Sequence, residues 1–285
     1  MSTFWQKLPK PFLALAPMED VTDTVFRQIV VKCGKPDVML TEFVNVDGMY
    51  SPGQEKVRQR LIFTEVERPL VAQLWGLDPV NFYKAAKELI NLGFDGIDLN
   101  FGCPEKKVIR KGACIALINN RRLASEIIQA TREGVGSRIP ISIKTRIGLE
   151  KIATEEWVEF LLSHGLEALI VHGRTAKNES KVPANWGEIG KAVEVQNKMK
   201  LKTLIIGNGD IVSRKQALQK VAETHVDGVM IGRGIFRNLR LFADQDNLQK
   251  FTIQERLDLC LFHIRLFEYT WQSIKPVHHL KKYFK

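Results

Sequence analysis

The stretch ISIKTRIGLEKIATEEWVEFLLSHGLEALIVHG, residues 141–173, contains the pattern that decides the fold. It opens with a short apolar run, continues into a segment with helical periodicity that ends on glycine, and closes on a second apolar run. A strand, a helix and a second strand in this order form the repeating unit of a parallel sheet. The two apolar runs also end on polar side chains, Lys144 and Arg146 in the first and His172 in the second.

The same pattern recurs along most of the chain. Eight strands are predicted, most of them separated by helical segments such as residues 78–93, and they span residues 12–17, 38–43, 70–75, 96–100, 141–146, 168–173, 203–208 and 228–232. Strands that are apolar throughout are typical of parallel sheets, which are buried on both faces. Eight such units favour a (β/α)8 TIM barrel over a doubly wound sheet.

Polar residues gather at the C-terminal ends of these strands, which form one rim on a barrel and carry its active site. They are Glu42, Gln73, Asn100, Lys144, Arg146, His172 and Asn208. Lys144 and Arg146 are two residues apart and therefore share one face of their strand. Two cations inside a barrel are costly unless an anion or an electron-rich ring lies nearby. His172 adds a further polar group at the same mouth.

Two glycine-rich turns follow the last two strands, GNGD at residues 207–210 and IGRG at residues 231–234. Glycine allows backbone N–H groups to approach a ligand closely. The loops after strands seven and eight of a barrel commonly bind phosphate, and Arg233 adds a fixed positive charge. These turns indicate a phosphorylated cofactor.

A cysteine lies on the corner that follows the fourth strand, in FDGIDLNFGCPEKKV, residues 94–108. Cys103 stands between Gly102 and Pro104 at the predicted mouth, where a structural cysteine is not expected. Its thiol could act as a nucleophile, for which a neighbouring base is needed, or as a proton donor, for which a neutral thiol is enough. The residues alone leave both roles open.

The composition favours a globular protein with an anionic partner. The chain has 285 residues, of which 45% are hydrophobic, and 42 basic against 32 acidic residues give a net charge of +10. Such an excess makes nucleic acid the first candidate partner. The sequence has no signal peptide and no membrane span, and its four cysteines form no CxxC pair, so we expect a cytoplasmic protein without a metal site or disulfides.

The C-terminal part differs from the rest. Thr252 and Glu255 form a capping box that opens a helical segment, and the chain ends in KPVHHLKKYFK, which is basic with interleaved aromatic residues. We therefore predict a barrel over residues 1–245 and a separate helical segment over residues 252–285.

Taken together, the motifs resemble the tRNA-dihydrouridine synthases, a family of flavin enzymes that reduce uridine in tRNA to dihydrouridine. The matching segments follow the family order and cover nearly the whole barrel: APMEDVTDTVFR (16–27), TEFV (41–44), VAQLWG (71–76), GIDLNFGCPEKKV (96–108), ISIKTRIG (141–148), VHGRT (171–175), IIGNGDI (205–211) and VMIGRG (229–234).

The resemblance implies FMN on the rim, NADPH (or NADH) as reductant, and a C-terminal helical domain that grips tRNA. It implies that the flavin is lined by Pro17, Met18 and Glu19, that its ring is bonded by Gln73, Lys144 and His172, and that its phosphate is held by Asn208, Gly209, Asp210, Gly232 and Arg233. Asn100 would contact the target uracil, and Arg146 would help to position it. Cys103 would be the general acid, giving a proton to C5 while hydride from FMN adds to C6.

The chain departs from the family pattern at several points. Glu19 and Asp20 replace the usual small residue after APM, and Cys114 replaces another small residue, where we interpret it as a packing residue. The helical segment is short for the family, which fits either a compact member or a truncated sequence. We expect a monomer without a stable protein partner.

Two other functions compete with this interpretation. An FMN barrel that reduces a free pyrimidine, similar to dihydroorotate dehydrogenases, would explain the flavin residues but not the net charge or the basic tail. A non-catalytic RNA-binding protein would explain the charge but not Asn100, Cys103 or the glycine-rich turns.

Overall fold

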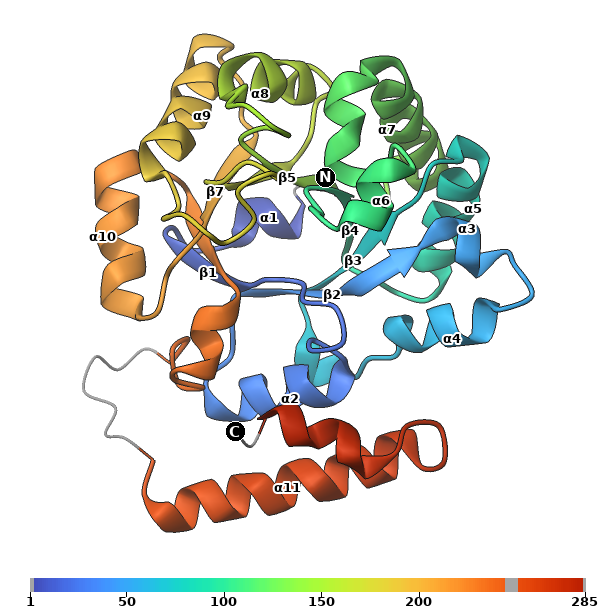
Figure 1. Ribbon diagram of the computed structural model, residues 1–285, viewed down its shortest axis with the longest axis vertical. Coiled ribbons are helices and arrows are strands. Elements are labelled where there is room, and N and C mark those ends of the chain that lie inside the picture. Colours follow the sequence, from blue (N-terminus) through green and yellow to red (C-terminus); the bar gives the residue numbers. More distant parts are fainter. Residues whose placement is uncertain (1–2, 244–250, 284–285) are drawn as a thin grey trace.

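The computed structural model describes residues 3–243 and 251–283, and its centre is a closed barrel of parallel strands (Figure 1). Each strand pairs with its neighbour in chain order, and β8 closes the ring by pairing with β1. The strands are β1 (Phe12–Leu15), β2 (Val38–Asn45), β3 (Leu70–Trp75), β4 (Gly96–Phe101), β5 (Ile141–Arg146), β6 (Ala168–His172), β7 (Leu204–Asn208) and β8 (Gly228–Ile231). The predicted TIM barrel and its eight strands are confirmed.

Helices surround the barrel, and their ends follow the capping signals in the sequence. The long ones are α2 (Thr24–Cys33), α5 (Pro79–Asn91), α7 (Arg121–Val135), α8 (Thr154–Leu162), α9 (Trp186–Lys198) and α10 (Arg214–Thr224). Asp78 caps α5 by accepting a hydrogen bond from Val80 N–H, with a proline at the first helical position. None of the described helices is long and apolar enough to cross a membrane.

Shorter elements fill the connections. They are α1 (Phe4–Lys7), α3 (Val46–Met49), α4 (Gln54–Arg58), α6 (Lys106–Arg110), and the 3-10 turns η1 (Gln59–Leu61), η2 (Glu65–Glu67), η3 (Cys114–Asn119), η4 (Arg233–Phe236) and η5 (Val277–Tyr283).

The barrel interior changes from apolar to polar along the strands. Near the N-terminal ends, inward side chains such as Phe12, Ala14 and Ile170 form one cluster, which Trp5 of α1 joins. The intervening residues face outward and pack against the helices in a second, larger cluster. Because side chains alternate between the two faces, the polar residues at the strand ends continue the inward row. The lower barrel is therefore a packed core, and the rim is left for polar groups.

The C-terminal segment packs on the outside of the barrel, against α2 (Figure 1). α11 (Ile253–Trp271) begins with the predicted capping box, in which Thr252 and Glu255 each bind the other's backbone N–H. Trp271 Nε1 donates to Asp23 at 3.0 Å, and Tyr283 stacks on Phe26. The predicted boundary between residues 245 and 252 lies mostly outside the described residues, so the division into two domains stays a prediction.

Glu42 was expected on the rim with the other polar strand ends, but it does not line the cavity there. The β2–β3 register shifts between Leu40 and Phe43, which marks a β-bulge. Glu42 instead borders a cavity beside the C-terminal segment, near Asp23 and Lys275. Burial raises the pKa of Glu42 to about 7, with the charge of Asp23 adding to the effect.

Candidate active site

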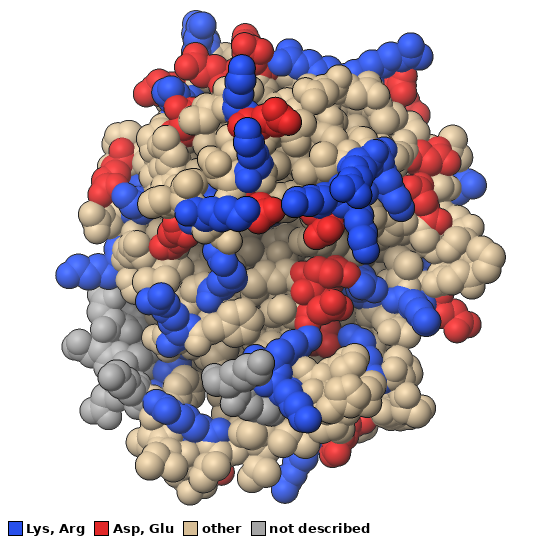
Figure 2. Space-filling model, viewed as in Figure 1, with Lys and Arg blue, Asp and Glu red and all other residues tan. Residues whose placement is uncertain are grey.

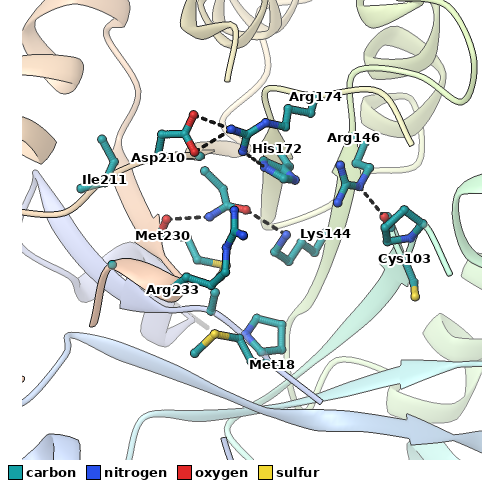
Figure 3. Close-up of a pocket in the computed structure, with 18 of the residues that line it drawn as sticks. Met18, Cys103, Lys144, Arg146, His172, Arg174, Asp210, Ile211, Met230 and Arg233 are labelled. Carbon is teal, nitrogen blue, oxygen red and sulfur yellow. Dashed lines mark hydrogen bonds and ion pairs between the residues drawn. The ribbon is translucent and has the colours of Figure 1, made fainter. Parts of the chain in front are cut away.

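A cavity of about 720 Å³ opens at the C-terminal ends of the strands, and every strand or the loop after it contributes to its wall (Figure 3). This volume is in the range of small-molecule sites. Nearly all of the predicted site residues line it: Pro17, Met18, Gln73, Asn100, Cys103, Lys144, Arg146, His172, Asn208, Gly209, Asp210, Gly232 and Arg233. The structure thus brings together side chains that lie more than 200 residues apart in the sequence.

Glu19 is the predicted residue that lies outside this cavity. Its carboxylate forms an ion pair with Arg60 and accepts a hydrogen bond from Phe43 N–H at 3.1 Å. It borders a second cavity beside the first. Its carboxylate is therefore engaged away from the ring-binding residues.

Lys144 is held at the centre of the cavity by Asn208. Lys144 Nζ donates to Asn208 Oδ1 at 3.0 Å, and Asn208 Nδ2 donates to the Met230 carbonyl at 2.8 Å. These bonds fix the Asn208 amide with its oxygen toward the lysine. Burial, assisted by the nearby charge of Arg146, lowers the pKa of Lys144 to about 8. The amine is therefore still mostly protonated at neutral pH.

His172 is a neutral side chain whose tautomer is set by Arg174. Arg174 Nη1 lies 3.3 Å from His172 Nε2, and because a guanidinium can only donate, Nε2 is the acceptor. The ring proton is then on Nδ1. Burial, together with the charge of Lys144, holds the pKa of His172 far below its ordinary value. The cavity thus contains a neutral imidazole beside a cationic amine.

A buried chain of hydrogen bonds runs from β5 to the loop that carries Cys103. Ser142 Oγ and Gln73 Nε2 donate to the two oxygens of Asp98, each at 2.7 Å. Asn100 Nδ2 donates to Gln73 Oε1 at 2.9 Å, and Asn100 Oδ1 accepts from Cys103 N–H at 2.9 Å. Since a backbone N–H can only donate, this chain sets the orientation of both amides. Asn100 therefore shapes the loop on which the thiol lies.

Arg146 fastens the same loop from β5. Its Nε donates to the Gly102 carbonyl at 2.8 Å, and its Nη1 lies 3.3 Å from the carbonyls of Thr175 and Glu179. It forms no ion pair with any residue that the structure describes. Burial lowers the pKa of Arg146 to about 10, which still leaves a full positive charge at the mouth. No described acidic side chain therefore neutralises Arg146.

The Cys103 thiol lies where the first cavity meets a second one, also of about 720 Å³. Asn100, Arg146 and His172 line both spaces, and Cys114 lines the second. Hydrogen bonding to the Cys114 thiol is the largest cause that lowers the pKa of Cys103, against its burial, to about 7. Burial raises the pKa of Cys114, which stays a thiol. Cys103 can thus exchange a proton near neutral pH.

The glycine-rich turns present one cation without a partner. Arg233 forms no hydrogen bond or ion pair within residues 3–243 and 251–283, and it points into the cavity (Figure 3). Gly209 has φ +141°, and a Cβ there would meet Ala184 Cβ at 2.5 Å. A Cβ at Gly232 would come no closer than 3.6 Å to any protein atom, so protein packing does not demand glycine there. An unpaired arginine beside a backbone left bare toward the cavity fits a phosphate group.

The Asp210 carboxylate is turned away from that phosphate position. Its oxygens accept from Arg174 Nη2 at 2.5 and 2.7 Å and from Ala184 N–H at 2.8 Å. These bonds, acting against partial burial, hold the pKa of Asp210 below its usual range. Only its backbone N–H remains for a ligand.

The cavity wall is strongly positive. Five cationic side chains line it, Lys144, Arg146, Arg174, Arg233 and Arg237, against one carboxylate, that of Asp210. On the face shown in Figure 2, Lys and Arg side chains border the hollow, together with several acidic side chains. Such a site favours anionic occupants. Among the described residues, no three His, Cys, Asp or Glu side chains converge as a metal ion would require.

Sequence reasoning missed three residues that shape the site. Arg174 and Arg237 line the cavity, and Asp98 lies beneath it. Arg174 lies two residues after His172, and Asp98 lies two residues before Asn100. Because side chains two apart on a strand share one face, this spacing could have predicted that both residues lie near the site. Arg237 lies in a turn without any such pattern.

Comparison with known proteins gives a consistent result. The family model described as dihydrouridine synthase matches residues 14–285. A probable tRNA-dihydrouridine synthase of Staphylococcus aureus (strain MRSA252) is 42% identical over 99% of this chain and 85% of its own length. A probable tRNA-dihydrouridine synthase 2 of Bacillus subtilis (strain 168) is 41% identical over 99% of this chain and 86% of its own length. Histamine dehydrogenase from Rhizobium sp. 4-9 shares the fold, with a TM-score of 0.59, 15% identity, and coverage of 80% of this chain and 44% of its own.

Proposed function

Because the chain belongs to the dihydrouridine synthase family, we propose that it reduces uridine in tRNA to 5,6-dihydrouridine, with FMN in the first cavity and the target uracil in the second. The observation that carries this arrangement is the place of Cys103. Its thiol lies where the two cavities meet, so it can face a base in one space that reacts with a ring in the other.

The residues of the first cavity fit FMN in their chemistry. Gln73, Lys144 and the Nδ1–H of His172 are donors for the ring oxygens and nitrogens. Arg233 and the backbone of Asn208, Gly209, Asp210 and Gly232 would hold the phosphate, and Pro17 and Met18 would line the ring edge. Glu19, which is paired with Arg60, would border the space for the uracil rather than the flavin. When bound and reduced, FMN supplies the hydride that adds to C6 of uracil.

Cys103 would protonate C5 of the same ring. A pKa of about 7 allows the thiol to carry a proton at neutral pH and to release it readily, as an effective general acid requires. Asn100 and Arg146 hold the Cys103 loop through its backbone, which keeps the sulfur in one position. A positioned acid needs no rearrangement during the reaction.

The positive mouth fits tRNA as the substrate. A uridine inside folded tRNA has to leave its stack to reach the second cavity, and Asn100 and Arg146 border this space. Phosphate groups along the RNA would meet the basic rim, which would make binding strongly dependent on salt. We further propose NADPH (or NADH) as reductant, a cytoplasmic location and a monomeric state.

The test is to map dihydrouridine in tRNA from cells that lack this protein, and then to restore the gene. One or more sites should lose dihydrouridine and regain it on restoration, and the purified protein should show flavin absorbance and modify the same sites. Unchanged tRNA, or a purified protein that reduces free uracil or orotate but not tRNA, would contradict the proposal.

A further inference from the structure

Cys114, the second cysteine at the mouth, has an unusual backbone conformation. Cys114 is 1% exposed and has φ +56°, a left-handed conformation that residues other than glycine seldom adopt. Glycine would fill this position without strain. Strained positions of this kind cluster at functional sites, so the thiol itself needs an explanation beyond packing.

The two thiols face the same cavity. Both side chains line the second cavity, and the Cys114 thiol is the largest cause that lowers the pKa of Cys103. Residues 104–112, which join them, are mostly exposed and include Gly112, where an added Cβ would meet nothing within 4 Å. A disulfide requires the sulfurs to approach to about 2.05 Å. An exposed connecting segment can follow that movement without disturbing the barrel core.

We propose that Cys103 and Cys114 form a redox-sensitive thiol pair, in which a peroxide oxidises Cys103 and Cys114 then closes a reversible disulfide that removes the proton donor of uridine reduction. The consequence for activity rests on the proposed function of Cys103, whereas formation of the disulfide does not.

The chemistry balances with a peroxide as oxidant. The Cys103 thiolate attacks one oxygen of hydrogen peroxide, which gives a sulfenic acid and hydroxide. The Cys114 sulfur then attacks the sulfenic sulfur, the S–O bond breaks, and one water leaves as the S–S bond forms. Two equivalents of a thiol reductant restore both thiols and are themselves oxidised to a disulfide.

Exposure and charge favour Cys103 as the sulfur that is oxidised first. It borders both cavities and is partly exposed, whereas Cys114 is buried. Its thiolate is supported by the Cys114 S–H and by the charge of Arg146. Reactive cysteines are partly exposed and lie in such electropositive surroundings. Cys33 lines neither cavity, and burial raises its pKa to about 11 although Arg240 and Lys32 act to lower it.

The experiment treats the flavin-loaded protein with hydrogen peroxide, blocks remaining thiols, and maps tryptic peptides without reduction. Oxidised parent should contain peptide 88–106 linked to peptide 112–121. Uridine reduction should fall by roughly 10²-fold, as for a lost general acid, and dithiothreitol should restore it. Activities are compared with the untreated value of the same variant.

Two variants separate the pair from general oxidation. Cys114→Ala and Cys114→Ser, the second of which conserves volume if the first folds poorly, cannot form the link. In these variants Cys103 should be oxidised further to sulfinic acid, which dithiothreitol does not reverse. A matched control, Cys33→Ser, should behave as the parent.

The possible results distinguish this inference from the proposed function. If the parent accumulates Cys103 sulfinic acid without the linked peptides, or if Cys114→Ser recovers with dithiothreitol as the parent does, the thiol pair is refuted. If the link forms and uridine reduction continues at the untreated rate, the disulfide stands and the assignment of Cys103 as the acid fails.

Discussion

Replacing Cys103 with alanine should slow uridine reduction while leaving the earlier steps intact. Neither cofactor binding nor reduction by NADPH requires the thiol, so Cys103→Ala should retain flavin and be reduced at the parental rate. Loss of a general acid typically costs 10²–10⁴-fold, or about 3–5 kcal/mol in activation free energy. The slow step should then be transfer to uracil.

The pKa of Cys103 also predicts the shape of the pH profile. The proton donor is the thiol, so the rate should be greatest below pH 7 and should fall as the thiolate forms. With a pKa of about 7, roughly three quarters of the molecules carry the proton at pH 6.5 and roughly one quarter at pH 7.5. The descending limb should be absent from Cys103→Ala.

Single-turnover oxidation of pre-reduced flavin on addition of unmodified tRNA measures this step directly. Cys114→Ala is the matched control, because it retains the acid and removes only the S–H that lowers its pKa. The descending limb should then move to higher pH. A Cys103→Ala protein that is reoxidised at the parental rate, or with the parental pH profile, would refute the assignment of the acid.

Three further predictions concern the cofactor, the RNA and the fold. Arg233→Ala should lose retained flavin, since a charge-assisted phosphate contact is worth about 1.5–3 kcal/mol; full occupancy by flavin absorbance would contradict the phosphate assignment. Lys281→Ala, on the exposed C-terminal segment, should weaken tRNA binding and reduce its salt dependence. Lys7→Ala, at the opposite end of the barrel, should leave binding unchanged. Equal binding curves for the two variants would exclude the C-terminal segment from the RNA interface. Glu67→Gln should lower the free energy of unfolding in urea by about 3–5 kcal/mol, because it leaves the fully buried Arg27 without its 2.5 Å ion pair. A decrease below about 1 kcal/mol would contradict that reasoning.

The barrel and most of its rim were predictable because both follow from local patterns. Apolar strands that alternate with capped helices specify a parallel barrel, and alternation along each strand then fixes which side chains face inward. Lys144, His172 and Asn208 could thus be placed at one mouth before any contact was known. Glu42 could not, because the bulge that displaces it comes from the pairing of β2 with β3 rather than from its own neighbours.

The bonds between rim residues depend on which strands meet. Nothing local to Asp98 says that Gln73 and Ser142 will donate to it, since these residues lie on three different strands. The pairing of Arg174 with Asp210, 36 positions away, is of the same kind. The sequence therefore indicates which groups are at the mouth, whereas their orientation and tautomers come from long-range partners.

The charges at the mouth explain why the site combines a neutral histidine with a protonated lysine. Both side chains are only partly exposed, and burial lowers the pKa of each. The ordinary pKa of lysine is 10.5, so even a pKa of about 8 leaves Lys144 charged at neutral pH. The ordinary pKa of histidine is 6.5, so the decrease caused by burial and the neighbouring cations leaves His172 without charge. A flavin in the first cavity would thus meet a cationic donor at Lys144 and a neutral donor at His172. Adding a second charge at His172 would work against the cations that already surround it.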